Sequence, residues 1–193
     1  KVFTHLHNKF KTPDAALLVI CILQIAGIHR LKVIERAAIL HDIGKIGIDM
    51  TLLHKTDKLT PPDLYDLQQH PVIGMNILEP IEFLQDVRIC IGQHHERYDG
   101  QGYPYNVPAE QLLLESRILS IADAFDAMTS DRPYRKALPE KEAMQELIDN
   151  AGSQFDPELV PHFISLVKSG IFSFKNTEHP ALSRPLSPLT GTS

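Results

Sequence analysis

The sequence predicts an all-α fold, a bundle of helices, on two observations. Apolar residues recur every three or four positions along most of the chain, which is the spacing of one helix face. Proline stands where helices are expected to begin and glycine where they are expected to end, and no segment alternates as a strand does. With 193 residues the chain can form one domain with a sizeable core.

The first expected helix covers residues 15–26. Thr12, Pro13 and Asp14 form a typical helix start, and Gly27 is a natural stop. The stretch is apolar and uncharged. Because it holds only about a dozen of the ~20 residues that a membrane span needs, we expect a helix buried in the core and no membrane span.

The same signals predict the remaining helices. In the middle of the chain they are expected over 31–43, from Thr60 to about 69, over 72–78, and from Phe83 through Val87 and Ile91 to His94. A later helix has an apolar face made of Ile118, Ile121, Ala122, Phe125 and Met128. Two more begin at prolines, over 139–150 and 157–168.

One domain over residues 1–174 accounts for these elements, and residues 1–11 are either a linker or the start of the first helix. From about residue 175 the chain is rich in Pro, Ser and Thr without periodicity, so residues 175–193 are expected to form a flexible tail. Because the chain begins without Met, we expect a fragment, with a sensory or receiver domain upstream.

Composition excludes several classes of protein. A hydrophobic content of 43% with 22% charged residues excludes global disorder. The net charge of −5 argues against binding to a nucleic acid polymer or an anionic membrane, so an anionic substrate would need a local positive site. Cys21 and Cys90 lie in apolar runs and are expected to be buried free thiols in a reducing compartment, the cytoplasm.

Two dipeptides carry residues that bind metals. His41 and Asp42, on the expected helix, can direct an imidazole and a carboxylate at one point, with Lys45 four residues from His41 on the same face. His94 and His95 are adjacent, so they can point the same way only if their helix ends there, as the glycines that follow indicate.

Two further residues add to this set, although each has an ordinary alternative. His70 precedes Pro71 at a helix end and could be a solvated end residue. Asp123 lies among small and apolar neighbours, where an unpaired carboxylate is costly, and could pair with Arg117 or Arg97. Imidazoles and carboxylates together suit Fe, Mn, Ni, Co or Zn, and two such ions roughly 3.5–4 Å apart promote in-line displacement at phosphorus.

These motifs resemble the HD-GYP family of bacterial cyclic di-GMP phosphodiesterases, a branch of the HD superfamily. The resemblance covers residues from about 12 to 168. It is carried, in family order, by HDIGKIGI, His70-Pro71, HHERYDGQGYP, the stretch from Asp123 to Asp126, Arg132-Pro133-Tyr134-Arg135 and Phe155-Asp156-Pro157. The fold that it implies is the HD-superfamily helical bundle, with a metal site between helices and a Gly-Tyr-Pro (GYP) loop.

The resemblance also implies a role for each motif residue. Two divalent ions would be held by His41, Asp42, His70, His94, His95 and Asp123, with Asp42 bridging them. Lys45 would contact the scissile phosphate. Tyr103 and Gly102 of the GYP loop would approach the nucleotide, and Arg132 and Arg135 would hold phosphate or guanine. If the resemblance is set aside, the ordinary interpretation is that Tyr103 is an exposed aromatic residue in a loop and that Arg132 and Arg135 lie in a solvated turn.

The N-terminal segment departs from the family pattern. The family usually supplies another His from the first helix, and some members supply a Glu one turn earlier. Here Lys11 or Lys9 stands at the first position, and His7 or His5 at the second. A three-metal site is therefore not expected, and His5 and His7 either reach the site or lie in a linker.

The function implied by the resemblance is hydrolysis of cyclic di-GMP to pGpG, or onward to GMP. Two alternatives remain open. The chain could be an inactive domain that senses cyclic di-GMP or docks onto a diguanylate cyclase through its GYP loop, or it could hydrolyse a related cyclic dinucleotide such as cyclic GMP-AMP.

Overall fold

The computed structural model describes residues 28–131 and 135–169. Its helices and short 3₁₀ turns are α3 (Ile28–Leu40), η1 (Ile43–Gly47), α4 (Met50–Leu53), α5 (Pro61–Leu67), α6 (His70–Leu78), η2 (Glu82–Leu84), α7 (Gln85–Gly92), η3 (Ala109–Gln111), α8 (Leu114–Thr129), α9 (Glu140–Asp149) and α10 (Leu159–Lys168). Within these ranges no strand is present, although Ala151 and Phe155 form an isolated bridge, so the predicted all-α fold is confirmed.

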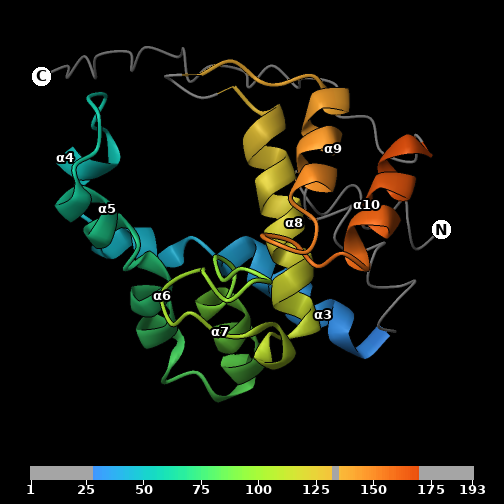
Figure 1. The fold of residues 1–193 in the computed structure, drawn as a ribbon. Coiled ribbons are helices and arrows are strands. Elements are labelled where there is room, and N and C mark those ends of the chain that lie inside the picture. Colours follow the sequence, from blue (N-terminus) through green and yellow to red (C-terminus); the bar gives the residue numbers. More distant parts are fainter. Residues whose placement is uncertain (1–27, 132–134, 170–193) are drawn as a thin grey trace, which may run out of the picture.

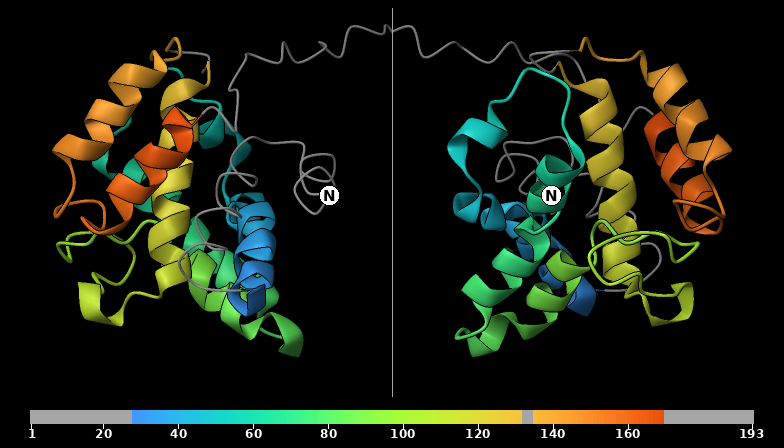
Figure 2. Two further views of the ribbon diagram at one scale, coloured as in Figure 1. Left: turned by 90° about the vertical axis from the view of Figure 1, so that its right-hand side faces the viewer. Right: turned by 60° about the vertical axis from the view of Figure 1, so that its left-hand side comes forward.

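Helix α8 is the centre of the bundle. Figures 1 and 2 show it running between α9 and α10 on one side and α3, α6 and α7 on the other. Four residues of its predicted apolar face are buried (Ile118, Ile121, Ala122 and Phe125), and Met128 is partly buried. Phe125 meets Phe163 of α10 edge-on at 5.3 Å between ring centroids. Because α8 packs against both α3 and α10, it joins the two sides of the core.

Most of the predicted helix signals are present. Thr60 caps α5 through a complete capping box with Asp63, as the sequence predicts. Helix α6 ends at Leu78, ahead of Pro80, and α9 and α10 lie within the expected ranges. None of the described helices is long and apolar enough to cross a membrane.

The expectation for Phe83 was wrong. This residue lies in η2 rather than in the following helix, and its side chain is 72% exposed. Arg36 of α3 lies over its ring, with the guanidinium carbon 5.5 Å from the ring centroid. Val87 and Ile91, the other members of that four-residue pattern, are buried as expected.

Cys90 is a buried free thiol, as predicted, and burial raises the pKa of this thiol to about 12.

Several expectations fall on parts of the chain that the structure does not describe. Outside the described residues lie the helix over 15–26, His5, His7, Lys9, Lys11, Cys21, Arg132 and the tail over 175–193.

Candidate metal centre

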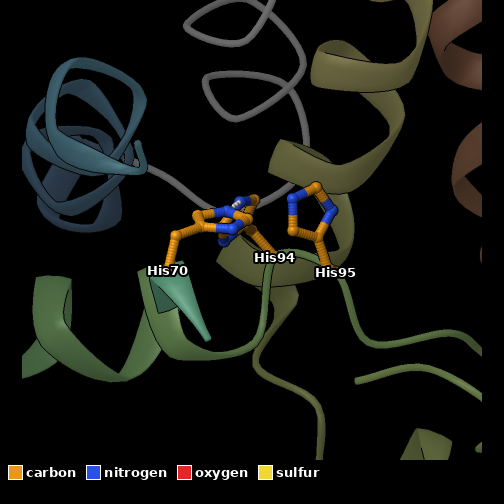
Figure 3. A group of neighbouring side chains, drawn as sticks. All are labelled: His70, His94 and His95. Carbon is orange, nitrogen blue, oxygen red and sulfur yellow. Dashed lines mark hydrogen bonds between the residues drawn. The ribbon is translucent and has the colours of Figure 1, made fainter. Parts of the chain in front are cut away.

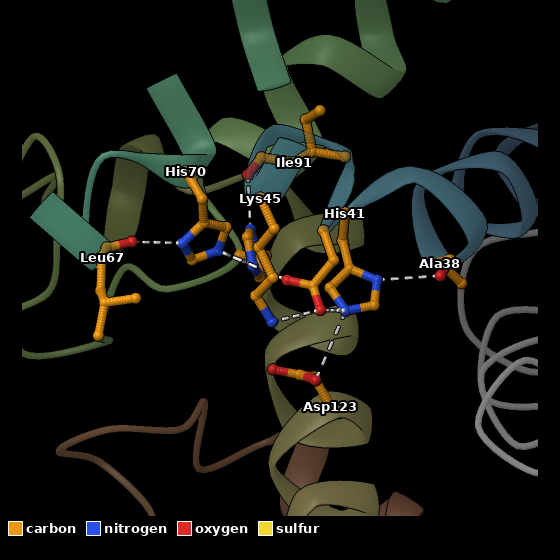
Figure 4. Close-up of polar contacts among 9 residues, drawn as sticks. Ala38, His41, Lys45, Leu67, His70, Ile91 and Asp123 are labelled. Carbon is orange, nitrogen blue, oxygen red and sulfur yellow. Dashed lines mark hydrogen bonds and ion pairs between the residues drawn. The ribbon is translucent and has the colours of Figure 1, made fainter. Parts of the chain in front are cut away.

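Four separate stretches of chain supply the centre. His41 and Asp42 come from the connection between α3 and η1, and Lys45 comes from η1 itself. His70 is the first residue of α6, His94 and His95 follow the end of α7, and Asp123 lies in the middle of α8. Figure 4 shows the labelled members of this group converging beside α8. The structure therefore brings together all six residues predicted as metal ligands.

The local structure around His41 differs from the prediction. Helix α3 ends at Leu40, so His41 and Asp42 lie in a turn and Lys45 in the short 3₁₀ segment η1. The cause is a close approach of η1 to α6: a Cβ on Gly44 would lie 1.8 Å from the carbonyl oxygen of His70. A glycine at this position lets the two backbones meet and places Asp42 next to His70.

Three of the imidazoles are oriented in the same way. In each ring Nδ1 donates a hydrogen bond to the backbone carbonyl three residues earlier, at 2.9 Å for His41, 2.8 Å for His70 and 2.6 Å for His94. A carbonyl can only accept, so the proton of the neutral ring is on Nδ1 and the lone pair is on Nε2. Backbone contacts of this kind typically orient histidines that bind metals.

The lone pairs of two rings face each other. The Nε2 atoms of His70 and His94 are 3.4 Å apart, although both bear lone pairs when the rings are neutral. His95 joins them, and the candidate ligand atoms of the three residues all lie within 4.8 Å of one another (Figure 3). Such an arrangement is unfavourable unless a cation lies between the nitrogens, so the donor set fits a metal ion.

Asp42 connects two of the imidazoles. One carboxylate oxygen, Oδ2, lies 3.5 Å from Nε2 of His41, and the other, Oδ1, lies 3.6 Å from Nε2 of His70. Nε2 of His41 is also 3.7 Å from Oδ1 of Asp123. Asp42 thus presents one carboxylate oxygen to each of two nitrogen donors, and oxygen and imidazole donors together suit a transition-metal ion.

Burial favours the neutral form of three of the imidazoles. It lowers the pKa of His94 to about 3 and also lowers the pKa of His70 and His95. Burial likewise raises the pKa of Asp123. Burial alone would raise the pKa of Asp42, but His41, Lys45 and His70 outweigh it and hold that pKa below its usual value.

These shifts predict that the metal-free protein loses stability in mild acid. Below the ordinary histidine pKa of about 6.5 the unfolded chain binds protons that buried His94 does not, so stability falls as the pH drops from 6.5 toward 3. For His94 alone, the loss between pH 7 and pH 5 is about 2 kcal/mol. Urea unfolding of chelator-treated protein at pH 7 and pH 5 measures it, and equal stabilities would contradict this assignment.

The alternative ion pairs for Asp123 were wrong. Arg117 pairs with the buried carboxylate of Asp156 at 2.6 Å, and Arg97 pairs with Asp99 at 2.7 Å. Both arginines thus have other carboxylate partners, and Asp123 faces His41.

The GYP loop lies against the histidines. The ring of Tyr103 stacks on that of His95, with centroids 4.8 Å apart and planes at 27°. Gly102 allows a close approach within the protein itself, because a Cβ there would lie 2.3 Å from the backbone nitrogen of Arg97. Arg135, beyond α8, donates to the carbonyl of Ala127.

One residue of this region was not predicted. Glu96 is a buried carboxylate, 3% exposed, that accepts hydrogen bonds from the backbone amides of Tyr105 at 2.7 Å and Val107 at 3.0 Å. The only signal in the sequence is an acidic residue directly after two candidate ligands. That signal did not show whether Glu96 binds a metal or holds the loop in place.

Comparison with known proteins agrees with this geometry. The model of a family described as "HD domain" matches residues 8–159. The chain belongs to the HD domain family. The match confirms the HD superfamily predicted from the motifs.

Relatives of this HD domain include named phosphodiesterases. The chain is 42% identical over 134 residues to the cyclic di-GMP phosphodiesterase response regulator RpfG of Xanthomonas campestris, covering 68% of this chain and 35% of the relative. It is 38% identical over 125 residues to the 3'3'-cGAMP-specific phosphodiesterase 3 of Vibrio cholerae, covering 65% and 27%. The HD domain thus spans about a third of the length of these relatives.

A solved structure supports the fold. Bd1817, a HDG"Y"P protein from Bdellovibrio bacteriovorus, superposes with a TM-score of 0.65 at 21% identity, covering 81% of this HD domain and 50% of that chain. At this identity the similarity shows the fold. Together with the relatives, it supports the predicted HD-GYP branch of the family.

Proposed function

We propose that this HD domain hydrolyses cyclic di-GMP to pGpG, or onward to GMP, as the output domain of a bacterial second-messenger pathway. The observation that carries the proposal is the pair of Nε2 lone pairs facing each other at 3.4 Å beside the carboxylate of Asp42. The 42% identity to a protein named a cyclic di-GMP phosphodiesterase supports the choice of substrate.

The proposed cofactor is a pair of divalent transition-metal ions, Fe, Mn, Ni, Co or Zn. The residues that would hold them are His41, His70, His94, His95 and Asp123, with Asp42 between the two ions. When bound, such ions stabilise the charge that develops on both oxygens of an in-line displacement at phosphorus. Neutral imidazoles are required for this, and burial supplies them by lowering the pKa of His70, His94 and His95.

Lys45 would supply positive charge to the substrate. Its Nζ lies 2.6 Å from Oδ2 of Asp42, while its side chain is still 45% exposed, so the ammonium can reach a phosphate from the edge of the centre. Tyr103 stacks on His95 and is partly exposed, which suits contact with a nucleotide beside the metals. Gly102, Arg132 and Arg135 complete the proposed substrate contacts.

Replacing Lys45 by alanine is expected to reduce kcat for cyclic di-GMP by about 100-fold, because one positive group at the reacting phosphate would be lost. The measurement is steady-state turnover followed by separation of the linear product. Lys55→Ala is the matched control, since Lys55 pairs with Asp63 at the start of α5 and is expected to leave kcat unchanged. Equal rates for both variants would exclude Lys45 from the reaction.

A second substrate has its own support. One relative, 38% identical, is named a 3'3'-cGAMP-specific phosphodiesterase. The two cyclic dinucleotides share the phosphodiester ring and differ in one base, so both fit the chemistry of the centre. Competition between them in one reaction mixture measures the ratio of their kcat/KM values directly.

The proposal is tested by reconstitution. Purified protein loaded with Mn or Fe is expected to linearise cyclic di-GMP, and the His41→Ala, Asp42→Ala double variant is expected to have no turnover. Binding of cyclic di-GMP without hydrolysis in every metal tested would overturn the proposal. That result would favour the alternative, a domain that senses the dinucleotide or contacts a diguanylate cyclase through the GYP loop.

The proposed context is a larger signalling protein in the cytoplasm. Residues 1–174 would form the HD-GYP domain. An upstream receiver or sensor domain would control it, in keeping with a relative named a response regulator that is about three times as long as the matched region.

A further inference from the structure

His95 is held differently from the other imidazoles of the centre. His41, His70 and His94 each donate from Nδ1 to a backbone carbonyl. Among the described residues, none hydrogen-bonds to the ring of His95. Its ring is covered by stacking on Tyr103, and the loop amide of Tyr103 donates to the backbone carbonyl of His95 at 3.2 Å.

We propose that Glu96 is a positioning residue that orients His95 for metal binding, acting through the GYP loop and Tyr103. The proposal rests on the proposed function in that it takes His95 as a metal ligand. It goes beyond it by assigning a role to a carboxylate that lies outside the ligand set.

Glu96 fixes the far end of the loop. Its two carboxylate oxygens accept separate hydrogen bonds, Oε1 from the amide of Tyr105 and Oε2 from the amide of Val107. Glu96 is only 3% exposed. Losing either hydrogen bond would therefore leave a buried carboxylate oxygen without its donor. The carboxylate is therefore tied firmly to the segment that follows Tyr103.

The near end of the loop is fixed against the same short stretch of chain. A Cβ on Gly102 would lie 2.4 Å from Cα of Glu96 and 2.3 Å from the backbone nitrogen of Arg97, so the loop backbone rests directly on these two residues. Within the loop, Asn106 has a φ of 54° and its side-chain amide donates to the carbonyl of Gly102 at 2.6 Å. Tyr103 is thus held between two fixed points, with its ring stacked on that of His95.

This arrangement gives Glu96 an indirect but specific task. Outer groups that orient a metal-binding histidine usually act by a hydrogen bond to its second ring nitrogen, as the backbone carbonyls do for the other three rings here. The ring of Tyr103 orients His95 instead, and Glu96 positions Tyr103 through the loop. Stacking restricts the tilt of the imidazole without taking up either nitrogen.

The test compares Glu96→Gln with Glu110→Gln, a substitution of an exposed residue in η3. Glutamine keeps the shape of Glu96 but offers one oxygen, so one of the two loop amides loses its acceptor. Zn²⁺ affinity, measured by competition with a chelating dye, is expected to fall 10–100-fold in Glu96→Gln and to stay at the wild-type value in the control.

A second readout follows the ring itself. In metal-free protein labelled with ¹⁵N-histidine, Glu96→Gln is expected to shift the ring signals of His95 and to leave those of His41, His70 and His94 in place. A purely structural role for Glu96 would disturb all four rings or none. Wild-type Zn²⁺ affinity with unchanged His95 signals in a folded variant would overturn the proposal.

Variants of Tyr103 test the same chain of contacts independently of Glu96. Tyr103→Phe keeps the ring, so the Zn²⁺ affinity and the His95 signals are expected to stay as in wild type. Tyr103→Ala removes the ring and is expected to reproduce the effect of Glu96→Gln. Opposite results would overturn the proposal. Neither the Zn²⁺ affinity nor the histidine signals require turnover. A failure of this proposal can therefore be distinguished from a failure to hydrolyse cyclic di-GMP.

Discussion

Replacing Asp42 by asparagine is expected to reduce turnover of cyclic di-GMP by more than about 100-fold. Loss of an outer partner of a metal ligand already costs about 10- to 100-fold, and Asp42 lies between two imidazoles with one oxygen toward each. Asparagine keeps the shape of the side chain but has one oxygen and no charge. It therefore cannot present an oxygen ligand on both the His41 side and the His70 side. The measurement is kcat at saturating Mn, together with the metal content of the purified variant.

The matched control is Asp66→Asn, which changes an exposed carboxylate in α5. Within the described part of the chain, the side chain of Asp66 contacts no residue of the centre. It is expected to keep both full turnover and full metal content. If Asp42→Asn behaved in the same way, Asp42 would not be a ligand. The centre would then have to be assigned to the imidazoles and Asp123.

The second large effect is expected from Gly44→Ala, which should destabilise the fold by about 3 kcal/mol or more, since overpacking without room to relax typically costs 1–3 kcal/mol. The added Cβ would meet backbone atoms, 1.8 Å from the carbonyl oxygen of His70 and 2.6 Å from the nitrogen of Gly74. Either η1 or α6 must move, and both carry residues of the centre. Urea unfolding at pH 7 gives the loss of stability.

Gly47→Ala is the matched control in the same short 3₁₀ segment. Its Cβ would meet side-chain carbons of Ile73, the nearest at 2.9 Å, and a side chain can yield where backbone cannot. We expect less than half the loss seen for Gly44→Ala, with metal binding retained. Equal losses at the two positions would show that η1 approaches α6 less closely than the structure indicates.

Much of the centre could be predicted because its residues carry local signals. His94 and His95 can point the same way only past a helix end, and α7 ends two residues earlier, at Gly92. Asp123 stands among apolar residues of α8, where burial of a carboxylate requires partners, and it faces His41. These local patterns made the residues candidates, and the resemblance to the HD-GYP family implied their common role as ligands.

The features that could not be predicted depend on contacts between distant segments. Helical spacing continues past Leu40, but α3 ends there because Gly44 must meet the backbone of His70. Phe83 continues a four-residue pattern, yet it lies outside α7 beneath Arg36 of α3. Glu96 accepts from amides nine and eleven residues later, a pairing with no periodic signal.

The carbonyl contacts of the histidine rings bear on how the protein would acquire its ions. His41, His70 and His94 are each aligned by the third residue before them, within one turn of chain. Nitrogen donors set in this way are in place before loading, so little conformational entropy remains to be lost when an ion arrives. The rate of uptake should then follow the supply of free ions, and slow rearrangement of the polypeptide should not limit it.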